Sequence, residues 1–271
     1  MGQIWMIASG KGGVGKSTIA AALGTALAKR DHKVCIVDAD IGLRDQDAIL
    51  GVEDRIVYDL VDVATKDCRL PQALVNPTDI PNLALLPAAQ FRRAKELERK
   101  AFRRILLLLK QTYDHIIIDC PAGIERSLRG LMNELIDQTV VICTPDDVCI
   151  RNAERVVALM QEKELPRPQL IVNRLDAQLI QHGEMYSALT VAQTLDLELL
   201  GEVPEEPLVY RALLKHMSLM DVDCEGRAAL DRIVSRMLGQ DVALPAYGSA
   251  KPGFFRRMFG PKLKEVKRVD S

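Results

Sequence analysis

Residues 10–17, with the sequence GKGGVGKS, decide the fold of this chain. They follow an apolar run at residues 4–8 that predicts a buried strand, and they precede an alanine- and leucine-rich run at residues 19–28 that predicts a helix. Strand, glycine loop and helix in this order form a phosphate-binding loop, in which backbone N–H groups surround an anion at the positive end of the helix. We therefore expect an α/β fold of the P-loop NTPase class, with a mostly parallel, doubly wound sheet flanked by helices.

This pattern assigns chemistry to its own residues. Lys16 is expected to reach the β- and γ-phosphates of a nucleotide, and the hydroxyl group of Ser17 is expected to ligate Mg²⁺. The predicted ligands are therefore ATP and Mg²⁺. Nucleotide contacts are expected from the loop and the residue after it: Gly10, Lys11, Gly12, Gly13, Val14, Gly15, Lys16, Ser17 and Thr18. The alternative is a glycine-rich turn that fits the pattern by chance.

A second lysine, Lys11, follows the first glycine of the loop. It repels Lys16, so it makes more sense if it neutralises phosphate charge that a partner subunit delivers. With both lysines present, GKGGVGKS resembles the deviant Walker motif of the MinD and ParA group of ATPases. In that group the first lysine reaches across a nucleotide-sandwich dimer. The resemblance therefore implies an ATP-dependent homodimer and catalytic roles for Lys11 and Lys16.

Two further apolar strands, predicted at residues 33–38 and 115–119, end in Asp38 and Asp119. The carboxyl ends of parallel strands form the edge at which open α/β sheets bind ligands. In a P-loop protein, an aspartate in the place of Asp119 reaches Mg²⁺, usually through water. Asp38 and Asp40 have an alternative interpretation as helix-capping residues, because a polar run follows them.

The segments after these strands resemble two switches of the MinD family. DADIGLRDQD, residues 38–47, is similar to D-x-D-x-G-L-R-N-L-D, with Asp45 and Gln46 in place of Asn and Leu. DCPAGIE, residues 119–125, is similar to D-[ST]-P-A-G-I-E, with Cys120 in place of the hydroxyl residue. The resemblance implies that Asp40 positions the attacking water and is catalytic. It also implies a set of residues at or near the metal: Ser17, Asp38 and Asp119.

Three later segments resemble base- and partner-binding parts of the same family. The strand at residues 169–173 ends in Asn173, whose amide carries the donor and acceptor that read the adenine edge in relatives. Residues 199–206 are similar to a loop whose backbone lines the base. Residues 144–155 are similar to a helix with which relatives contact partner proteins, although Asn152 and Glu154 replace aspartates. A solvated charged helix face is the other interpretation of that segment.

The bulk composition fits one ATPase domain followed by a tail. No run of eighteen apolar residues occurs in the 271 residues, and no signal core precedes the first strand, so we expect neither a spanning helix nor secretion. The six cysteines form no C-x-x-C pair, which favours reduced thiols and disfavours relatives that hold an iron–sulfur cluster. We predict an ATPase domain at residues 1–243, a linker at 244–252 and a tail at 253–271.

The tail differs from the body in charge and in aromatic content. From Lys251 onward, seven basic residues stand against two acidic ones, so this segment carries +5 and the remainder −6, for a net charge of −1. Three of the five phenylalanines lie here, and residues 253–260 predict an amphipathic helix. The expected membrane contacts are Phe254, Phe255, Arg256, Arg257, Met258 and Phe259. A helix that docks back on the body, or a disordered basic tail, is the alternative.

The same segment resembles the C-terminal membrane-targeting helix of the MinD family, G-F-[FL]-[KR]-[KR]-[LMI]-F-G. Burial of its four large apolar side chains gains about 6 to 12 kcal/mol, whereas ordering about ten residues costs roughly 1 kcal/mol or more each. Attraction to anionic lipid adds about 1 kcal/mol per basic residue, so a single tail binds only marginally. Two tails in one dimer act together through their effective concentration. Dimerisation driven by ATP would thus cause the protein to bind the membrane.

On these motifs the chain is identified as a member of the MinD family of septum-site ATPases. Membership implies Mg-dependent hydrolysis of ATP to ADP and phosphate, and a cytoplasmic protein that binds anionic lipid reversibly on the cytoplasmic face of the inner membrane. It also implies two partners. The membrane-bound dimer would recruit a division inhibitor (MinC), and a topological factor (MinE) would stimulate hydrolysis and release the dimer.

Three other functions stay open at this point. A flagellar-number ATPase of the FlhG type has the same fold and a similar tail, but it typically carries an extension before the first strand, which here begins at Gln3. A ParA-type DNA-partitioning ATPase needs a basic body surface. The net charge of −6 on the residues before Lys251 argues against it, so no nucleic-acid partner is expected. The third is a scaffold that binds ATP without hydrolysing it.

Overall fold

The computed structural model describes residues 1–92, 96–124, 126–214 and 217–245. Their centre is one sheet of seven strands in the order β3-β2-β4-β1-β5-β6-β7, in which each pair of neighbours runs parallel. This confirms the predicted α/β architecture. The strands are β1 (Gln3–Ala8), β2 (Val34–Asp38), β3 (Leu83–Leu86), β4 (His115–Asp119), β5 (Gln138–Cys143), β6 (Gln169–Leu175) and β7 (Glu198–Pro204).

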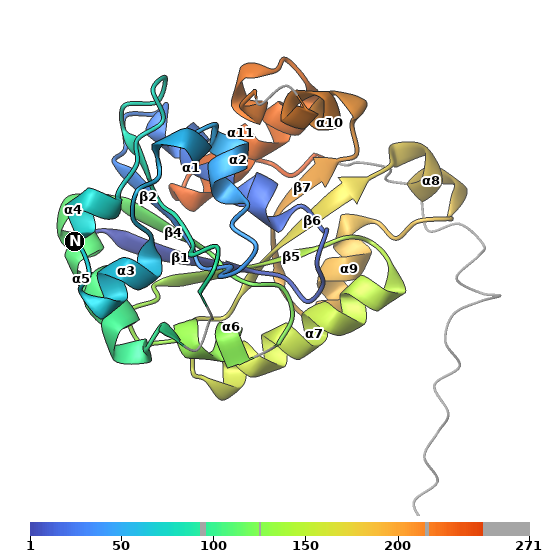
Figure 1. Ribbon diagram of the computed structural model, residues 1–271. Coiled ribbons are helices and arrows are strands. Elements are labelled where there is room, and N and C mark those ends of the chain that lie inside the picture. The colour runs from blue at the N-terminus through green and yellow to red at the C-terminus, as the bar shows by residue number, and fades with distance from the viewer. Residues whose placement is uncertain (93–95, 125, 215–216, 246–271) are drawn as a thin grey trace, which may run out of the picture.

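Helices cover both faces of the sheet, as a parallel sheet requires, because its strands are apolar on both sides (Figure 1). α1 (Lys16–Ala28) and α11 (Glu225–Met237) pack together on one face. α5 (Arg99–Thr112), α7 (Asp147–Glu162) and α9 (Ala188–Leu195) cover the other face. The other α-helices are α2 (Gln46–Leu50), α3 (Leu60–Thr65), α4 (Leu70–Ala73), α6 (Arg126–Leu131), α8 (Ala177–His182) and α10 (Pro207–Leu214).

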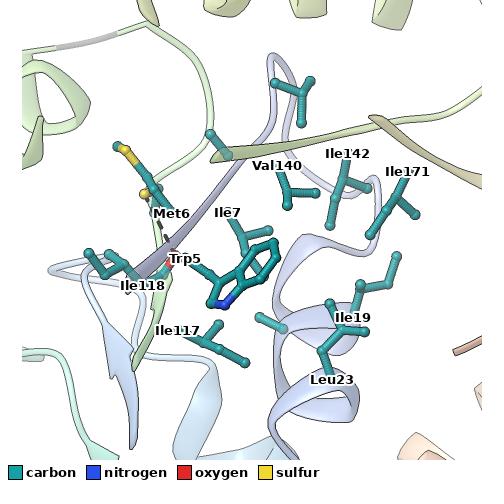
Figure 2. Close-up of a cluster of buried hydrophobic side chains, with 14 of the residues drawn as sticks. Trp5, Met6, Ile7, Ile19, Leu23, Ile117, Ile118, Val140, Ile142 and Ile171 are labelled. Carbon is teal, nitrogen blue, oxygen red and sulfur yellow. Dashed lines mark hydrogen bonds between the residues drawn. The ribbon is translucent and has the colours of Figure 1, made fainter. Parts of the chain in front are cut away.

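The core holds the glycine loop between two buried elements. Figure 2 shows Trp5 of the central strand β1 beside Ile19 and Leu23 of α1, and all three side chains are buried. A Cβ atom on Gly24 would lie 2.7 Å from Cδ1 of Ile36 in β2, so glycine lets α1 approach the sheet closely. Since both ends of the loop are anchored in this core, its backbone N–H groups are held in place before any ligand arrives.

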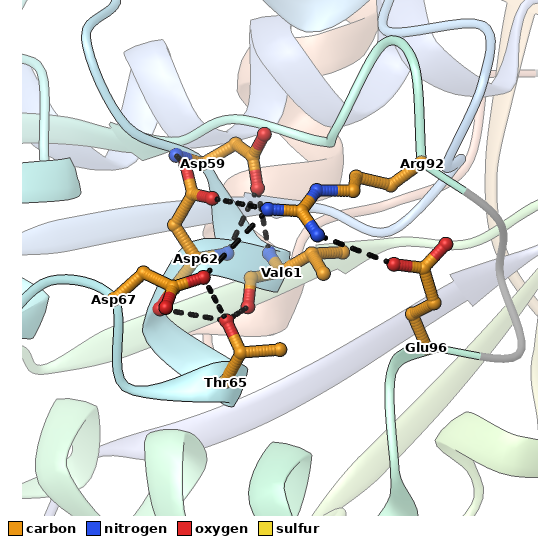
Figure 3. A network of polar contacts seen from close by, with 7 residues as sticks. All are labelled: Asp59, Val61, Asp62, Thr65, Asp67, Arg92 and Glu96. Atoms are coloured by element: carbon orange, nitrogen blue, oxygen red, sulfur yellow. Dashed lines mark hydrogen bonds and ion pairs between the residues drawn. The ribbon is translucent and has the colours of Figure 1, made fainter.

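A polar network fixes the segment that follows β3. Figure 3 shows Arg92 between the carboxylates of Asp62, Asp67 and Glu96, at N–O distances of 3.3, 3.6 and 3.4 Å. Asp62 also forms a capping box with Asp59 at the start of α3. The Arg92 side chain is 43% exposed, so each ion pair contributes little to stability. Together they link Arg92 to Asp62, to Asp67 and to Glu96.

The C-terminal end of the described body is tied to the sheet by one arginine. The guanidinium group of Arg236 in α11 donates to the carbonyl oxygens of Leu200 at 2.8 Å, Val242 at 2.8 Å and Ala243 at 2.7 Å. These bonds reach the predicted domain boundary at residue 243. Most of the predicted linker and the whole predicted tail, residues 246–271, lie outside the described residues, so this division of the chain stays a prediction.

None of the helices in the described ranges is both long and apolar enough to cross a membrane.

Glu202 lies inside β7 with 6% of its surface exposed. Burial raises the pKa of its carboxyl group from 4.5 to about 7, although the guanidinium groups of Arg236 and Arg232 act in the opposite direction. Between these two values the folded protein holds a proton that the unfolded chain releases. The free energy of unfolding therefore falls as the pH rises through this window.

Replacing Glu202 by glutamine should remove this part of the pH dependence. The quantity to compare is the unfolding free energy of Glu202→Gln minus that of the wild type. We expect this difference to become more positive by about 2 to 3 kcal/mol from about pH 5 to about pH 8, because only the wild type loses stability in this window. Urea denaturation at the two pH values measures the change. Glu198→Gln, at an exposed glutamate of the same strand, is the matched control. If the unfolding free energies of variant and wild type differed by the same amount at both pH values, Glu202 would not be a buried, protonated residue.

Candidate nucleotide-binding and hydrolysis site

The glycine loop between β1 and α1 takes a shape that only glycine permits at several positions. Gly13 and Gly15 have φ values of +78° and +88°, in the left-handed region. A Cβ atom on Gly10 would lie 2.2 Å from the backbone carbonyl carbon of Asn152 in α7. One on Gly15 would lie 2.5 Å from Nδ2 of Asn173. No side chain caps the start of α1, so its first N–H groups point toward an anion site.

Lys16 forms a buried ion pair at the base of the site. Its Nζ lies 2.6 Å from Oδ1 of Asp119 and 3.4 Å from Oγ of Ser17, and 6% of the residue is exposed. Burial opposes the charge, but the ion pair and hydrogen bond with Asp119 raise the pKa of Lys16 above its ordinary value. The ammonium group therefore stays charged, as contact with phosphates requires.

The two aspartates after β2 have different surroundings. Asp38 is fully buried and accepts hydrogen bonds from the backbone N–H groups of Asp40 at 3.0 Å and Gln46 at 3.2 Å. Burial and the nearby charge of Asp119 raise the pKa of Asp38 to about 8. Burial also raises the pKa of the half-buried Asp40. Asp38 thus lies beside Asp119, and its side chain accepts the first N–H group of α2, whose N-cap residue is Asp45.

The loop, the segment after β2 and the end of β6 enclose a pocket of about 470 Å³, here called the phosphate pocket. Its lining includes Lys11, Gly12, Gly13, Gly15, Lys16, Ser17, Thr18, Asp40, Leu43, Asp45, Ala122 and Arg174. Most residues predicted to contact the nucleotide therefore come together. Gly10 and Val14 are not among the residues that line it, so their nucleotide contacts stay a prediction: Gly10 lies against α7, and the carbonyl group of Val14 accepts a hydrogen bond from Asn173.

A smaller pocket of about 110 Å³ adjoins the phosphate pocket at Gly15, Thr18 and Arg174. Asn173 lines it, and its role in reading the adenine edge stays a prediction. Asn173 has a second role that the sequence did not predict, because its Nδ2 donates to the carbonyl group of Val14 at 2.8 Å and so braces the loop. Arg174, with a φ value of +61°, lies between the two pockets and was not predicted as a site residue.

The segment predicted as a base-lining loop is only partly a loop. β7 continues to Pro204, so residues 199–204 form a strand, and only Glu205 and Glu206 follow it. The carboxylate of Glu206 accepts the backbone N–H groups of Glu225 at 3.2 Å and Gly226 at 3.0 Å. It therefore caps α11 and stabilises the helix that covers this side of the site.

Gln46 is a residue of the site that the motifs did not single out. Its Nε2 donates to Oδ2 of Asp119 at 2.7 Å and to the carbonyl oxygen of Ser17 at 2.9 Å. Its Oε1 is buried and has no hydrogen-bond partner among the described residues, which costs about 1–3 kcal/mol. The donor set of Ser17, Asp38, Asp119 and this orphaned oxygen suits hydrated Mg²⁺, which takes oxygen ligands and keeps several waters.

At the edge of the sheet that carries the phosphate pocket, a cation and three apolar side chains face solvent, and of these Lys11 and Leu43 line the pocket. Lys11 is exposed. Leu43, Ile124 and Val148 follow β2, β4 and β5 at the same edge of the sheet, and they are 68%, 40% and 56% exposed. We call these four residues the mouth surface. Apolar side chains that gather beside a ligand pocket are typical of an interface.

Comparison with known proteins agrees with this site. The ParA family model, described as NUBPL iron-transfer P-loop NTPase, matches residues 1–238. The septum site-determining protein MinD of Bacillus subtilis is 38% identical over 262 residues, which cover 95% of this chain and 97% of that protein. The protein of the same name from Helicobacter pylori is 39% identical over 267 residues, covering 96% and 99%.

Solved structures of similar fold include MinD proteins as well. The MinC:MinD cell division protein complex of Aquifex aeolicus matches with a TM-score of 0.82 and 34% identity, over 90% of this chain and 99% of that one. MinD of Pyrococcus horikoshii OT3, complexed with Mg-ADP, matches with a TM-score of 0.77 and 25% identity, over 88% and 96%. The phosphate pocket, the full-length matches and the shared fold together show that this chain belongs to the MinD family of ParA-type P-loop ATPases.

Proposed function

We propose that this ATPase acts as a nucleotide-switched homodimer that binds a membrane surface through its C-terminal tail and places the cell-division septum. The observation that carries the proposal is the position of the two loop lysines. Lys16 is buried at the base of the phosphate pocket, whereas Lys11 is exposed at its mouth. One cation is therefore placed for the chain's own nucleotide and the other for a group that arrives from outside.

A second copy of the chain is the group that best fits the mouth surface. A two-fold symmetric dimer would place two phosphate pockets face to face, so that each Lys11 approaches the phosphates of the partner. Leu43, Ile124 and Val148 would lose their exposure to water in the same contact. Because the triphosphate adds negative charge between two positive loops, ATP would stabilise this dimer more than ADP would.

Hydrolysis would follow from the groups already in the pocket. On nucleotide binding, Lys16 would exchange Asp119 for the β- and γ-phosphates, while the loop N–H groups hold the remaining phosphate oxygens. Asp40, at the rim of the pocket, would orient the attacking water. Mg²⁺, when bound, supplies charge neutralisation of the phosphates. Ser17 and Asp119 would hold it directly or through water, with Asp38 near its water shell.

Membrane and partner binding follow from relatives and from the tail. The tail residues lie outside the described residues, so their role rests on the Phe-rich, basic sequence. A MinC-like division inhibitor is supported by the Aquifex aeolicus complex, in which a homologue of this chain is bound to MinC. A MinE-like activator that stimulates hydrolysis, and reversible attachment to the cytoplasmic face of the inner membrane, are proposed on family resemblance. The acidic body gives no support for a nucleic-acid partner.

Co-sedimentation with vesicles tests the switch. We expect the purified protein to bind vesicles that contain anionic phospholipid when it carries a slowly hydrolysed ATP analogue, and to stay in solution with ADP. Equal binding with both nucleotides would contradict the proposal. Co-sedimentation with DNA instead of vesicles would support a ParA-type partitioning function.

Replacing Lys11 by alanine should prevent ATP-dependent dimerisation. Loss of a charge that faces phosphates in an interface typically costs about 2–5 kcal/mol, so we expect the dimer to weaken by roughly 30-fold or more. Light scattering with the ATP analogue measures the molecular mass. Lys33→Ala, at an exposed lysine just before β2, is the control and should leave the dimer intact. A Lys11→Ala protein that dimerises normally would exclude the trans role of this residue.

A further inference from the structure

Gln46, the first residue of α2, lies at the centre of the metal-binding residues. Its side chain is completely buried and reaches from the segment after β2 to β4 and α1. Nε2 donates to Oδ2 of Asp119 at 2.7 Å and to the carbonyl oxygen of Ser17 at 2.9 Å. The backbone N–H group donates to Oδ2 of Asp38 at 3.2 Å. This one residue therefore contacts all three residues expected at the metal.

The other end of the amide has no partner. Oε1 of Gln46 is buried and accepts no hydrogen bond within the described part of the chain. Where Gln46 stands, the MinD motif quoted above has leucine, which would fill similar space without burying a polar atom. A buried amide whose oxygen has no hydrogen bond is unfavourable unless that oxygen gains a partner when the site is loaded. This points to a donor that arrives with the ligand.

We propose that Gln46 is a positioning residue of the magnesium site. Its amide nitrogen holds the Asp119 carboxylate and the Ser17 backbone, and its amide oxygen accepts a hydrogen bond from a water molecule bound to Mg²⁺. Mg²⁺ keeps several waters in such sites, and each needs an acceptor. The inference rests on the metal-dependent nucleotide binding proposed above, and it assigns to this chain a contact that the leucine of the motif cannot make.

The contacts of Asp119 explain why a second donor is useful. In the structure Lys16 binds Oδ1 at 2.6 Å and Gln46 binds Oδ2 at 2.7 Å. When Lys16 moves to the phosphates, Gln46 keeps the carboxylate oriented, and Oδ1 becomes free for the metal or its water. Without Gln46, the Asp119 carboxylate would have neither of these two donors once Lys16 has moved to the phosphates.

Removing the amide should weaken magnesium binding selectively. Loss of an outer-shell partner typically lowers metal affinity 10- to 100-fold. In Gln46→Leu we therefore expect the free Mg²⁺ concentration at the midpoint of the Mg²⁺-induced rise in ADP affinity to increase about 10- to 100-fold. Affinity for ADP in the presence of EDTA should change less than about twofold, because no loop contact to phosphate is altered. Fluorescence anisotropy of labelled ADP in Mg²⁺ buffers measures both, and ADP keeps the readout independent of hydrolysis.

Two further variants complete the test. Gln46→Met has the same chain length without the amide and should show the same shift, so the test does not depend on the folding of the leucine variant. Gln111→Leu, at an exposed position of α5, should match the wild type. If both Gln46 variants had the same Mg²⁺ midpoint as the wild type, the role of Gln46 alone would be overturned. If the ADP affinity of the wild type did not change with Mg²⁺, the proposed metal dependence would be overturned as well. Unfolding of both variants would assign the amide to the fold and likewise overturn the inference.

Discussion

Replacement of Lys16 by alanine is expected to lower the rate of ATP hydrolysis by at least about 100-fold, because it removes the cation that would face the β- and γ-phosphates. Lys16 lies in the phosphate pocket within hydrogen-bond reach of Asp119, so its ammonium group is held at the base of the site. Steady-state release of phosphate measures the effect. A scaffold that only binds ATP would show an equally low rate in wild type and variant.

The same replacement affects stability, and this effect has to be separated from catalysis. It leaves the buried Asp119 carboxylate without its ion pair, which typically costs about 3–5 kcal/mol, although Gln46 still donates to Oδ2. The double variant Lys16→Ala/Asp119→Asn should therefore regain stability while hydrolysis stays lost. Lys29→Ala, at the C-cap of the same helix, is the control, because its ion pair with Asp221 is exposed and should contribute less than about 1 kcal/mol.

Replacement of Phe255 by glutamate is expected to abolish binding to anionic vesicles while ATP binding persists. Phe255 belongs to the predicted tail, outside the described residues. Loss of one buried phenylalanine removes about 1.5–3 kcal/mol, and the repulsion of a new carboxylate from anionic lipid adds about 1 kcal/mol. Both tails of a dimer carry the change, so the loss is doubled and sedimentation with vesicles should fall to background.

Phe91 offers a matched control for this substitution. It is 93% exposed and belongs to the body of the protein, so Phe91→Glu introduces the same change away from the tail. Vesicle binding of this variant should equal that of the wild type. If Phe255→Glu sedimented like the wild type, or if Phe91→Glu lost binding to the same degree, the tail would not be the membrane anchor.

The strands that carry the site could be predicted because their sequences are simple. β1, β2 and β4 are buried on both faces, so each reads as an uninterrupted apolar run that ends at a glycine loop or an aspartate. The ends of such strands meet at one edge of the sheet. Asp38 and Asp119 could therefore be expected at that edge, and the adjacency of β2 and β4 places them in register.

Contacts that depend on the order of the strands were missed. Gln46 reaches Asp119, which lies 73 residues away in the chain, because β2 and β4 are adjacent in the sheet. Asn173 reaches Val14 across 159 residues because the end of β6 comes back to the glycine loop. Glu206 lines the smaller pocket, and the return of α11 over the sheet also gives its carboxylate two backbone N–H groups to cap.

The sequence by itself determined the class of fold, the phosphate-binding loop, the carboxylates at the strand ends and the family, because each is encoded in a short continuous stretch with its own physical signature. The tertiary structure decided which side chains support those groups: Gln46 beneath Asp119, Asn173 behind the loop and Arg174 between the two pockets. Such contacts join distant segments through the strand order β3-β2-β4-β1-β5-β6-β7, which arises when the whole apolar core is buried at once and which no local pattern encodes.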